Sequence, residues 1–170
     1  AHSSVGFSVK HLVISNTKGE FSDFAGTIML DENDITKSSL EVTIKTASIS
    51  THDDKRDAHL RSADFFDVEK HPEITFKSKK VEKTSAGYQL TGDLTIRGVT
   101  KEVSFPFTLV GPVPDPWGGK RLAAQASVTV NRQEFGVSWN KTLDGGGLLV
   151  GDEVTINIEV EAVHAKPGTN

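Results

Sequence analysis

The stretch Val150-Gly-Asp-Glu-Val-Thr-Ile-Asn-Ile-Glu-Val-Glu161 indicates the fold class, because apolar and polar side chains alternate without a break from Glu153 onward. Successive side chains of a β-strand point to opposite faces of a sheet, so this alternation predicts a strand with one buried and one solvated face. The same period predicts further strands, one of them long and bent, at residues 5–9, 17–30, 40–45, 74–80, 88–97, 103–109 and 124–130. The chain is therefore expected to be all-β, with about eight strands.

The connections favour antiparallel order, because most are turns that are too short for a crossover helix. Ser85-Ala-Gly87 and Arg97-Gly98 have the residue types that tight hairpins need. Helical structure is expected at two places, a turn near residues 10–15 and a short helix over residues 53–63 that Asp53 caps.

Eight antiparallel strands with one apolar face form either a sandwich or a closed barrel. The nine Phe and two Trp are spread over many segments, whereas an immunoglobulin-type sandwich would concentrate aromatic residues around one central strand. This spread favours a barrel, which leaves no exposed sheet edge and is wide enough to hold one elongated ligand. With 170 residues, the sequence predicts one domain over residues 1–170.

Composition narrows the function classes. Lys and Arg number 19 against 23 Asp and Glu, and this balance argues against binding to nucleic acid or to an acidic membrane surface. The absence of Cys excludes disulfides, thiolate metal sites and cysteine nucleophiles, and leaves the redox compartment open. No apolar run reaches the 18 or more residues of a spanning helix, so stable membrane insertion is not expected.

Four segments, in order and spanning nearly the whole chain, resemble the signature segments of the YceI-like family. They are Ala1-His-Ser-Ser-Val-Gly-Phe-Ser-Val-Lys-His11, Arg56-Asp-Ala-His-Leu-Arg-Ser-Ala-Asp-Phe-Phe-Asp-Val68, Leu90-Thr-Gly-Asp-Leu-Thr-Ile-Arg-Gly-Val-Thr100 and Val150-Gly-Asp-Glu-Val154. The resemblance implies a lipocalin-like antiparallel barrel, with one or two short helices near its mouth, that encloses a long isoprenoid or fatty-acyl chain. It also implies a homodimer, no established catalysis, and a periplasmic or secreted location. A cytoplasmic location stays open because the sequence does not begin with Met.

A simple energy comparison agrees with a long lipid as the partner. Each buried methylene contributes about 0.8 kcal/mol, while association costs roughly 4–15 kcal/mol, so an apolar pocket needs a ligand with well over ten buried carbons. The alternative is that the same apolar residues fill a solid core. The candidate lining residues are Phe7, Leu12, Phe21, Phe24, Leu40, Ile44, Leu60, Phe65, Ile74, Phe76, Leu94, Ile96, Phe105, Phe107, Val128, Phe135 and Trp139.

The predicted helix carries the polar candidates Arg56, Asp57, His59 and Arg61. They are expected either to fix the helix over the barrel mouth or to meet a lipid head group, and the fixing role is favoured. Neighbouring acidic and His residues lack the spacing of a metal site, so no metal is predicted.

Catalytic motifs are also lacking, and neither a catalytic residue nor a cofactor is predicted. Residues 142–147 lack the Lys of a phosphate-binding loop, and Ser62 lies in no nucleophile elbow. Two rival functions stay open, an enzyme acting on a lipid-like substrate through carboxylate or His59 chemistry, and a solid β-sandwich interaction module. Trp139 is expected to plug a barrel end, whereas Trp117 is expected to gate, plug, enter a donor membrane or contact a second copy.

Overall fold

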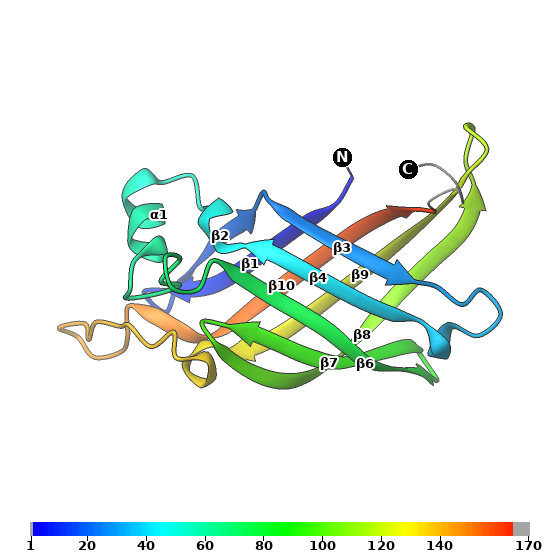
Figure 1. Cartoon of the computed structure of the whole chain (residues 1–170). Helices are drawn as coiled ribbons and strands as arrows, with labels where there is room; N and C mark the ends of the chain where they lie inside the picture. Colours follow the sequence, from blue (N-terminus) through cyan, green and yellow to red (C-terminus); the bar gives the residue numbers. More distant parts are fainter. Residues whose placement is uncertain (1, 165–170) are drawn as a thin grey trace.

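The computed structural model describes residues 2–164 and shows one antiparallel sheet of ten strands that curls into a half-barrel (Figure 1). Within these residues, one helix, α1 (Asp54–Arg61), and three short 3-10 turns, η1 (Ile35–Lys37), η2 (Thr46–Ser48) and η3 (Arg132–Phe135), connect strands. The strands are β1 (Ser4–His11), β2 (Ser15–Phe21), β3 (Phe24–Met29), β4 (Ser39–Lys45), β5 (Ile49–Ser50), β6 (Glu73–Thr84), β7 (Gly87–Ile96), β8 (Val99–Pro114), β9 (Lys120–Asn131) and β10 (Val150–Val163).

The strand order is β3-β4-β6-β7-β8-β9-β10-β1-β2-β5. The alternating stretch that predicted the fold class is β10, which pairs with β9 on one side and β1 on the other. Ile156 is opposite Phe7 of β1 and Val128 of β9, so three apolar side chains share one row of the inner face. This inner face surrounds the interior of the half-barrel.

The predicted all-β, antiparallel class is confirmed, and the strand count is ten rather than about eight. One added strand is the short β5. The other arises because the strand predicted over residues 17–30 breaks at Ser22 and Asp23, whose backbone N–H groups donate to the carbonyl and the hydroxyl oxygen of Ser48. β2 therefore pairs with β1, whereas β3 pairs with β4 and forms the other edge of the sheet.

The predicted helical turn near residues 10–15 is wrong. β1 continues to His11 and β2 begins at Ser15, with Lys10 opposite Asn16 in the ladder. Leu12 and Val13 form the connection with φ values of 54° and 67°, and the backbone N–H of Leu12 donates to the carbonyl of Leu149. Strand pairing with two neighbours thus outweighs the weak helical pattern of this stretch.

The second helical prediction is confirmed by α1. Asp53 precedes the helix, and its carboxylate accepts a hydrogen bond from the backbone N–H of Arg56 at 3.0 Å. This contact satisfies one of the free amides of the first turn. Across residues 2–164, no helix combines the length and the apolar character that crossing a membrane requires.

Two groups of buried side chains form the core. The larger lies where the sheet meets α1 and η3 and includes Ile49, Phe65 and Phe135, and the smaller is centred on Val81, Leu90 and Phe105 of β6, β7 and β8. A cavity remains inside the curled sheet, and its lining includes residues of both groups, such as Phe65 and Phe105.

Candidate functional site

The candidate site is an internal cavity of about 1330 Å³. It is lined by the apolar positions of the alternating strands, such as Phe7 and Val9 of β1 and Ile156 and Ile158 of β10. Pockets for drug-sized ligands have volumes of roughly 300–1,000 Å³, so this cavity accommodates a longer molecule. The alternation of each strand therefore places polar side chains outside and a continuous apolar wall inside.

All of the predicted lining residues except Leu12 line this cavity. Leu12 lies in the turn between β1 and β2, and 39% of its surface is exposed. The prediction counted Leu12 among the alternating apolar residues, but the turn places it outside the lining of the cavity. Whether the other residues contact a ligand stays a prediction; they are Phe7, Phe21, Phe24, Leu40, Ile44, Leu60, Phe65, Ile74, Phe76, Leu94, Ile96, Phe105, Phe107, Val128, Phe135 and Trp139.

Further lining residues follow the same period but are not among the predicted ones. Most of them belong to strands that the sequence did predict, so the alternation alone would have identified them. They include Val5, Val9, Val42, Val81, Leu90, Val103, Leu109, Ala124, Ala126, Val130, Val154, Ile156, Ile158 and Val160.

An aromatic cluster closes the end of the cavity beneath α1, and we call this end the covered end. The ring of His59 lies edge-on to Phe65 at 5.0 Å and to Trp139 at 4.7 Å between centroids. Phe65 and Trp139 are 5.4 Å apart, and Phe135 beside them is 1% exposed. These contacts fit the expected plugging role of Trp139.

Buried Arg132 supports the covered end from η3. Its guanidinium donates to the carbonyls of Val137 at 2.6 Å, Trp139 at 2.9 Å and Gly151 at 2.8 Å. Burial lowers the pKa of Arg132, and the nearby carboxylate of Asp152 opposes this effect. Arg132 could not be predicted from the sequence, because its acceptors are backbone carbonyls that become neighbours only after folding.

The four polar candidates of α1 separate into two pairs. Arg56 and His59 line the cavity, whereas Asp57 and Arg61 do not. Arg56 donates from Nε to the hydroxyl of Thr51 at 2.8 Å and from Nη2 to its carbonyl at 2.9 Å. His59 Nε2 lies 2.8 Å from a carboxylate oxygen of Asp64, and the His59 side chain is 39% exposed.

Asp57 and Arg61 hold the helix against the sheet. The buried carboxylate of Asp57 accepts hydrogen bonds from the backbone N–H of Thr51 at 2.8 Å and from its hydroxyl at 2.6 Å. Burial opposes ionisation of Asp57, but these two hydrogen bonds and the charges of Arg61 and Arg56 outweigh it and lower its pKa. Arg61 donates to the carbonyls of Ala47 at 3.0 Å and Ile49 at 3.1 Å.

The cavity also reaches the surface between β3 and the C-terminal part of β10. Among residues 2–164, β3 pairs only with β4, and β10 beyond Glu159 pairs only with β9 because β1 begins at Ser4. Met29 on β3 and Val163 on β10 line the cavity and are 67% and 56% exposed. We call this part of the cavity the side opening; Figure 1 labels both strands.

Two basic side chains at the side opening, Lys120 and Arg121, are paired with carboxylates. Lys120 Nζ lies 3.2 Å from each carboxylate oxygen of Glu32, which joins β9 to the loop between β3 and β4. Arg121 donates to Glu161 at 2.7 Å and to Asp115 at 3.3 Å. Backbone hydrogen bonds from Gly119 and Trp117, together with Arg121, hold the pKa of Asp115 below its usual value despite opposing burial.

Within residues 2–164, no three His, Asp or Glu side chains gather closely enough to hold a metal ion. What the site offers is a long apolar surface with hydrogen-bonding groups near its two ends. Such a surface is suited to burying an extended apolar molecule.

A curled antiparallel sheet around an elongated apolar cavity defines a lipocalin-like class of protein. This chain belongs to the YceI-like family, whose domain model matches residues 1–162. It is 41% identical over 165 residues to Protein YceI of Escherichia coli, covering 97% of this chain and 83% of that relative. The resemblance found in the sequence is thereby confirmed.

Solved structures share the fold. The crystal structure of BcnA from Burkholderia cenocepacia has a TM-score of 0.81 at 26% identity, covering 94% of this chain and 96% of that chain. A polyisoprenoid binding domain from Saccharophagus degradans, implicated in plant cell wall breakdown, has a TM-score of 0.70 at 11% identity, with coverages of 96% and 94%. At that identity, the second likeness shows the fold alone.

Proposed function

We propose that this protein binds a long-chain isoprenoid, such as a polyisoprenoid or isoprenoid quinone, or a fatty-acyl lipid, and carries it through the aqueous phase. The observation that supports this proposal most directly is the apolar cavity of about 1330 Å³ inside the half-barrel. The shared fold with a polyisoprenoid binding domain favours an isoprenoid chain. Lipid sequestration, without catalysis or a cofactor, is the proposed activity.

The binding free energy comes from burial of the chain. At about 0.8 kcal/mol for each buried methylene, a chain that fills the cavity offsets an association cost of roughly 4–15 kcal/mol. Arg56 and His59 are the proposed contacts for a polar head group at the covered end, since both line the cavity there. Asp57 and Arg61 act indirectly, by keeping α1 in place.

The assembly and location of the protein are part of the proposal. We expect a single lipid-binding domain that forms a homodimer in the periplasm or outside the cell. The resemblance to the family supports both expectations. A carrier in an aqueous compartment between membranes fits a cavity that shields an apolar chain from water.

Native mass spectrometry of protein purified without detergent tests the proposal. We expect an adduct of several hundred daltons that extracts into organic solvent as a long apolar chain. Ala124 lines the cavity on β9, so Ala124→Trp should reduce the amount of adduct by filling the space. Ser127→Trp, on the exposed face of the same strand, is the matched control and should retain the lipid. Protein without any adduct, or equal loading of both variants, would contradict lipid carriage.

The rival enzymatic function rests on the pair formed by His59 and Asp64, because a carboxylate can orient a His ring for proton transfer. Extraction of the bound lipid into organic solvent distinguishes the carrier from the enzyme. Under the carrier proposal, His59→Ala releases the same unmodified lipid as the native protein. Turnover of a lipid-like substrate that His59→Ala abolishes would favour the enzyme instead.

A further inference from the structure

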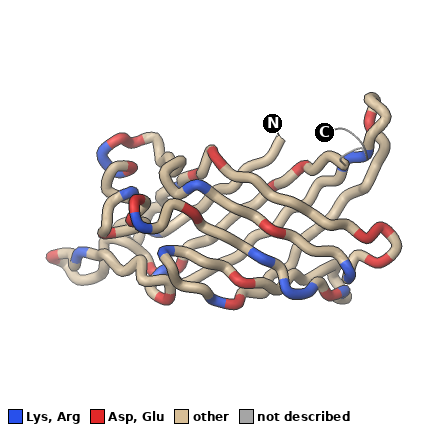
Figure 2. Tube along the Cα trace, in the orientation of Figure 1, with Lys and Arg blue, Asp and Glu red and all other residues tan. Residues whose placement is uncertain are grey.

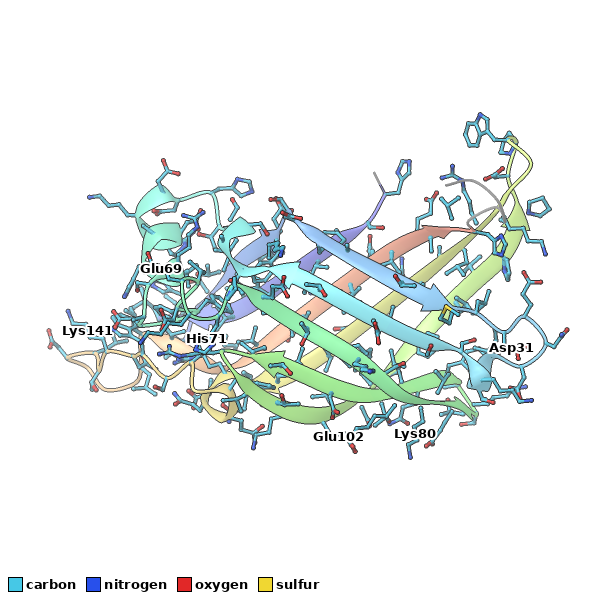
Figure 3. All side chains as sticks on the ribbon, in the orientation of Figure 1. Asp31, Glu69, His71, Lys80, Glu102 and Lys141 are labelled. Carbon is cyan, nitrogen blue, oxygen red and sulfur yellow. The ribbon has the colours of Figure 1, made fainter. Side chains whose placement is uncertain are left out.

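The outer face of the sheet changes character beside the side opening. Along most of β8, β9 and β10 the outward positions are polar, as at Thr108, Gln125 and Glu159. Elsewhere on the sheet, the labelled side chains of Lys80 and Glu102 likewise point away from the curled strands (Figure 3). Near the side opening this rule fails, since Val110, Val113 and Val163 are 67%, 51% and 56% exposed.

The strand register brings Val110, Val113 and Val163 onto one part of the outer face. Val113 of β8 is opposite Arg121 of β9, and Arg121 is opposite Val163 of β10, so these three residues form one row. Val110 is opposite Ala123 in the adjacent row. We call the exposed apolar residues at this opening the apolar rim, and they are Met29, Val110, Val113, Trp117 and Val163.

Trp117 gives the apolar rim an amphipathic anchor. It lies at the tip of the hairpin between β8 and β9 with 72% of its surface exposed. The guanidinium of Arg121 is 5.1 Å from the centre of its ring. Trp beside a cationic side chain is the combination that membrane–water interfaces favour, because the ring is apolar while the cation and the indole N–H remain in contact with polar groups.

The charges at the rim indicate which kind of membrane fits. Lys120 is paired with Glu32, and Arg121 with Asp115 and Glu161, so these two cations face three carboxylates. Figure 2 shows Lys and Arg interspersed with Asp and Glu over the visible strands and loops. Electrostatic attraction to anionic lipids is therefore weak, and burial of the apolar rim has to supply the binding free energy.

We propose that the apolar rim docks on the surface of an electrically neutral lipid bilayer, so that the side opening faces the membrane. This inference rests on the proposed lipid carriage. Met29 and Val163 belong both to the rim and to the cavity wall, so a docked rim gives the lipid a continuous apolar path. A chain entering from the bilayer then avoids exposure to water, which costs about 0.8 kcal/mol for each methylene.

Tryptophan fluorescence with phosphatidylcholine vesicles that carry brominated acyl chains tests this docking. The chain has only two Trp, and Trp139 packs against Phe65 and His59 at the covered end. We expect vesicles to quench the emission of Trp117, and the Trp117→Phe variant to lose the quenched component. The double variant Val113→Ser and Val163→Ser should lower the vesicle partition coefficient about tenfold, because two apolar side chains no longer enter the interface.

Ile14→Ser is the matched control. Ile14 is 88% exposed in the turn between β1 and β2, at the opposite end of β1 from the side opening, so its replacement should leave vesicle binding unchanged. Binding should also persist at high salt, since the rim charges are already paired. Thermal unfolding of each variant shows whether the fold is retained before the vesicle data are compared.

Three outcomes would overturn the docking. The first is equal quenching of the native protein and Trp117→Phe; the second is loss of binding in Ile14→Ser but not in the double variant. The third is a native protein that is dimeric and does not bind vesicles, together with a double variant that is monomeric. This result would show that the apolar rim contacts a second copy of the chain. Lipid carriage is judged separately, because a lipid adduct in the mass spectrum together with absent quenching refutes only the docking.

Discussion

Asp57 shows at the scale of one residue how a buried charge positions the site. Its carboxylate accepts both a backbone and a side-chain hydrogen bond from Thr51, the residue that joins β5 to the segment before α1. The hydroxyl of Thr51 in turn accepts from Arg56 Nε. This chain of contacts links the first turns of α1 to the sheet beside the cavity, and it depends on the ionised form of Asp57.

We predict that Asp57→Asn lowers the free energy of unfolding at pH 7 by about 1–3 kcal/mol, the usual cost of weakening a buried charged hydrogen bond. The pKa of Asp57 is lowered from its usual 3.8 in the folded protein. Its stabilising contribution is therefore complete above the unfolded-state value and is lost as the pH falls through the lower folded-state value. Urea unfolding from pH 7 to pH 3 measures the free energy of unfolding of both proteins. The difference in this free energy between native protein and variant should become smaller at acidic pH.

Asp144→Asn provides the control for this titration, because Asp144 lies exposed in the loop between β9 and β10. It should leave the stability nearly unchanged at every pH. If the free energy of unfolding of Asp57→Asn stays below that of the native protein by the same amount down to pH 3, ionisation of the carboxylate is not what stabilises the folded state.

At the scale of elements, α1 acts as a cover held by a few polar contacts. The helix is eight residues long, and Asp57 is its only buried residue. Isolated helices of this length are not stable in water, so the position of α1 depends on its tertiary contacts. Arg56 binds Thr51, and Arg61 binds the carbonyls of Ala47 and Ile49.

We predict that replacing both Arg56 and Arg61 by Ala loosens the covered end without unfolding the sheet. Amide hydrogen exchange should accelerate over residues 53–61, while β7, β8 and β9 keep their protection, because local opening requires only the loss of these contacts. Lys55→Ala, on the exposed side of the same helix, should exchange like the native protein. If exchange instead becomes faster to the same extent in all strands, the two Arg residues stabilise the whole fold.

At the scale of the whole molecule, the half-barrel surrounds a cavity that is lined by the apolar side chains of its strands. Both groups of core residues lie beside this cavity, and Val128 and Phe76 pack against both groups. An apolar ligand in the cavity therefore contacts both parts of the core. Such a ligand is expected to stabilise the folded chain.

We predict that extracting the proposed lipid lowers the melting temperature while the protein remains folded. Ligand bound only by the folded state stabilises it by about 2.7 kcal/mol at a concentration one hundred times its dissociation constant. Differential scanning calorimetry before extraction, after extraction and after reloading should show loss and recovery of this stability. The melting temperature of Ala124→Trp should change much less on extraction. An equal change in this variant and the native protein would argue against a ligand inside the cavity.

Local sequence is sufficient to predict the faces of most strands and the start of α1. The period of two assigns Ile156 and Val128 to the inner face without knowledge of their neighbours, and Asp53 marks the helix N-terminus through its own side chain. Leu12 was misplaced because three apolar residues in a row carry no clear period, and pairing with the adjacent strands then decides their conformation.

The tertiary structure alone decides where the sheet stays open. The break at Ser22 depends on Ser48, which is distant in the sequence, and it transfers β3 to the edge opposite β2. The side opening and the apolar rim follow from this transfer together with the register that aligns Val113, Arg121 and Val163. Side-chain alternation is a property of neighbouring residues, so the sequence reveals which face is apolar; register and sheet curvature arise from contacts between distant segments, so only the folded chain shows where that face meets the surface.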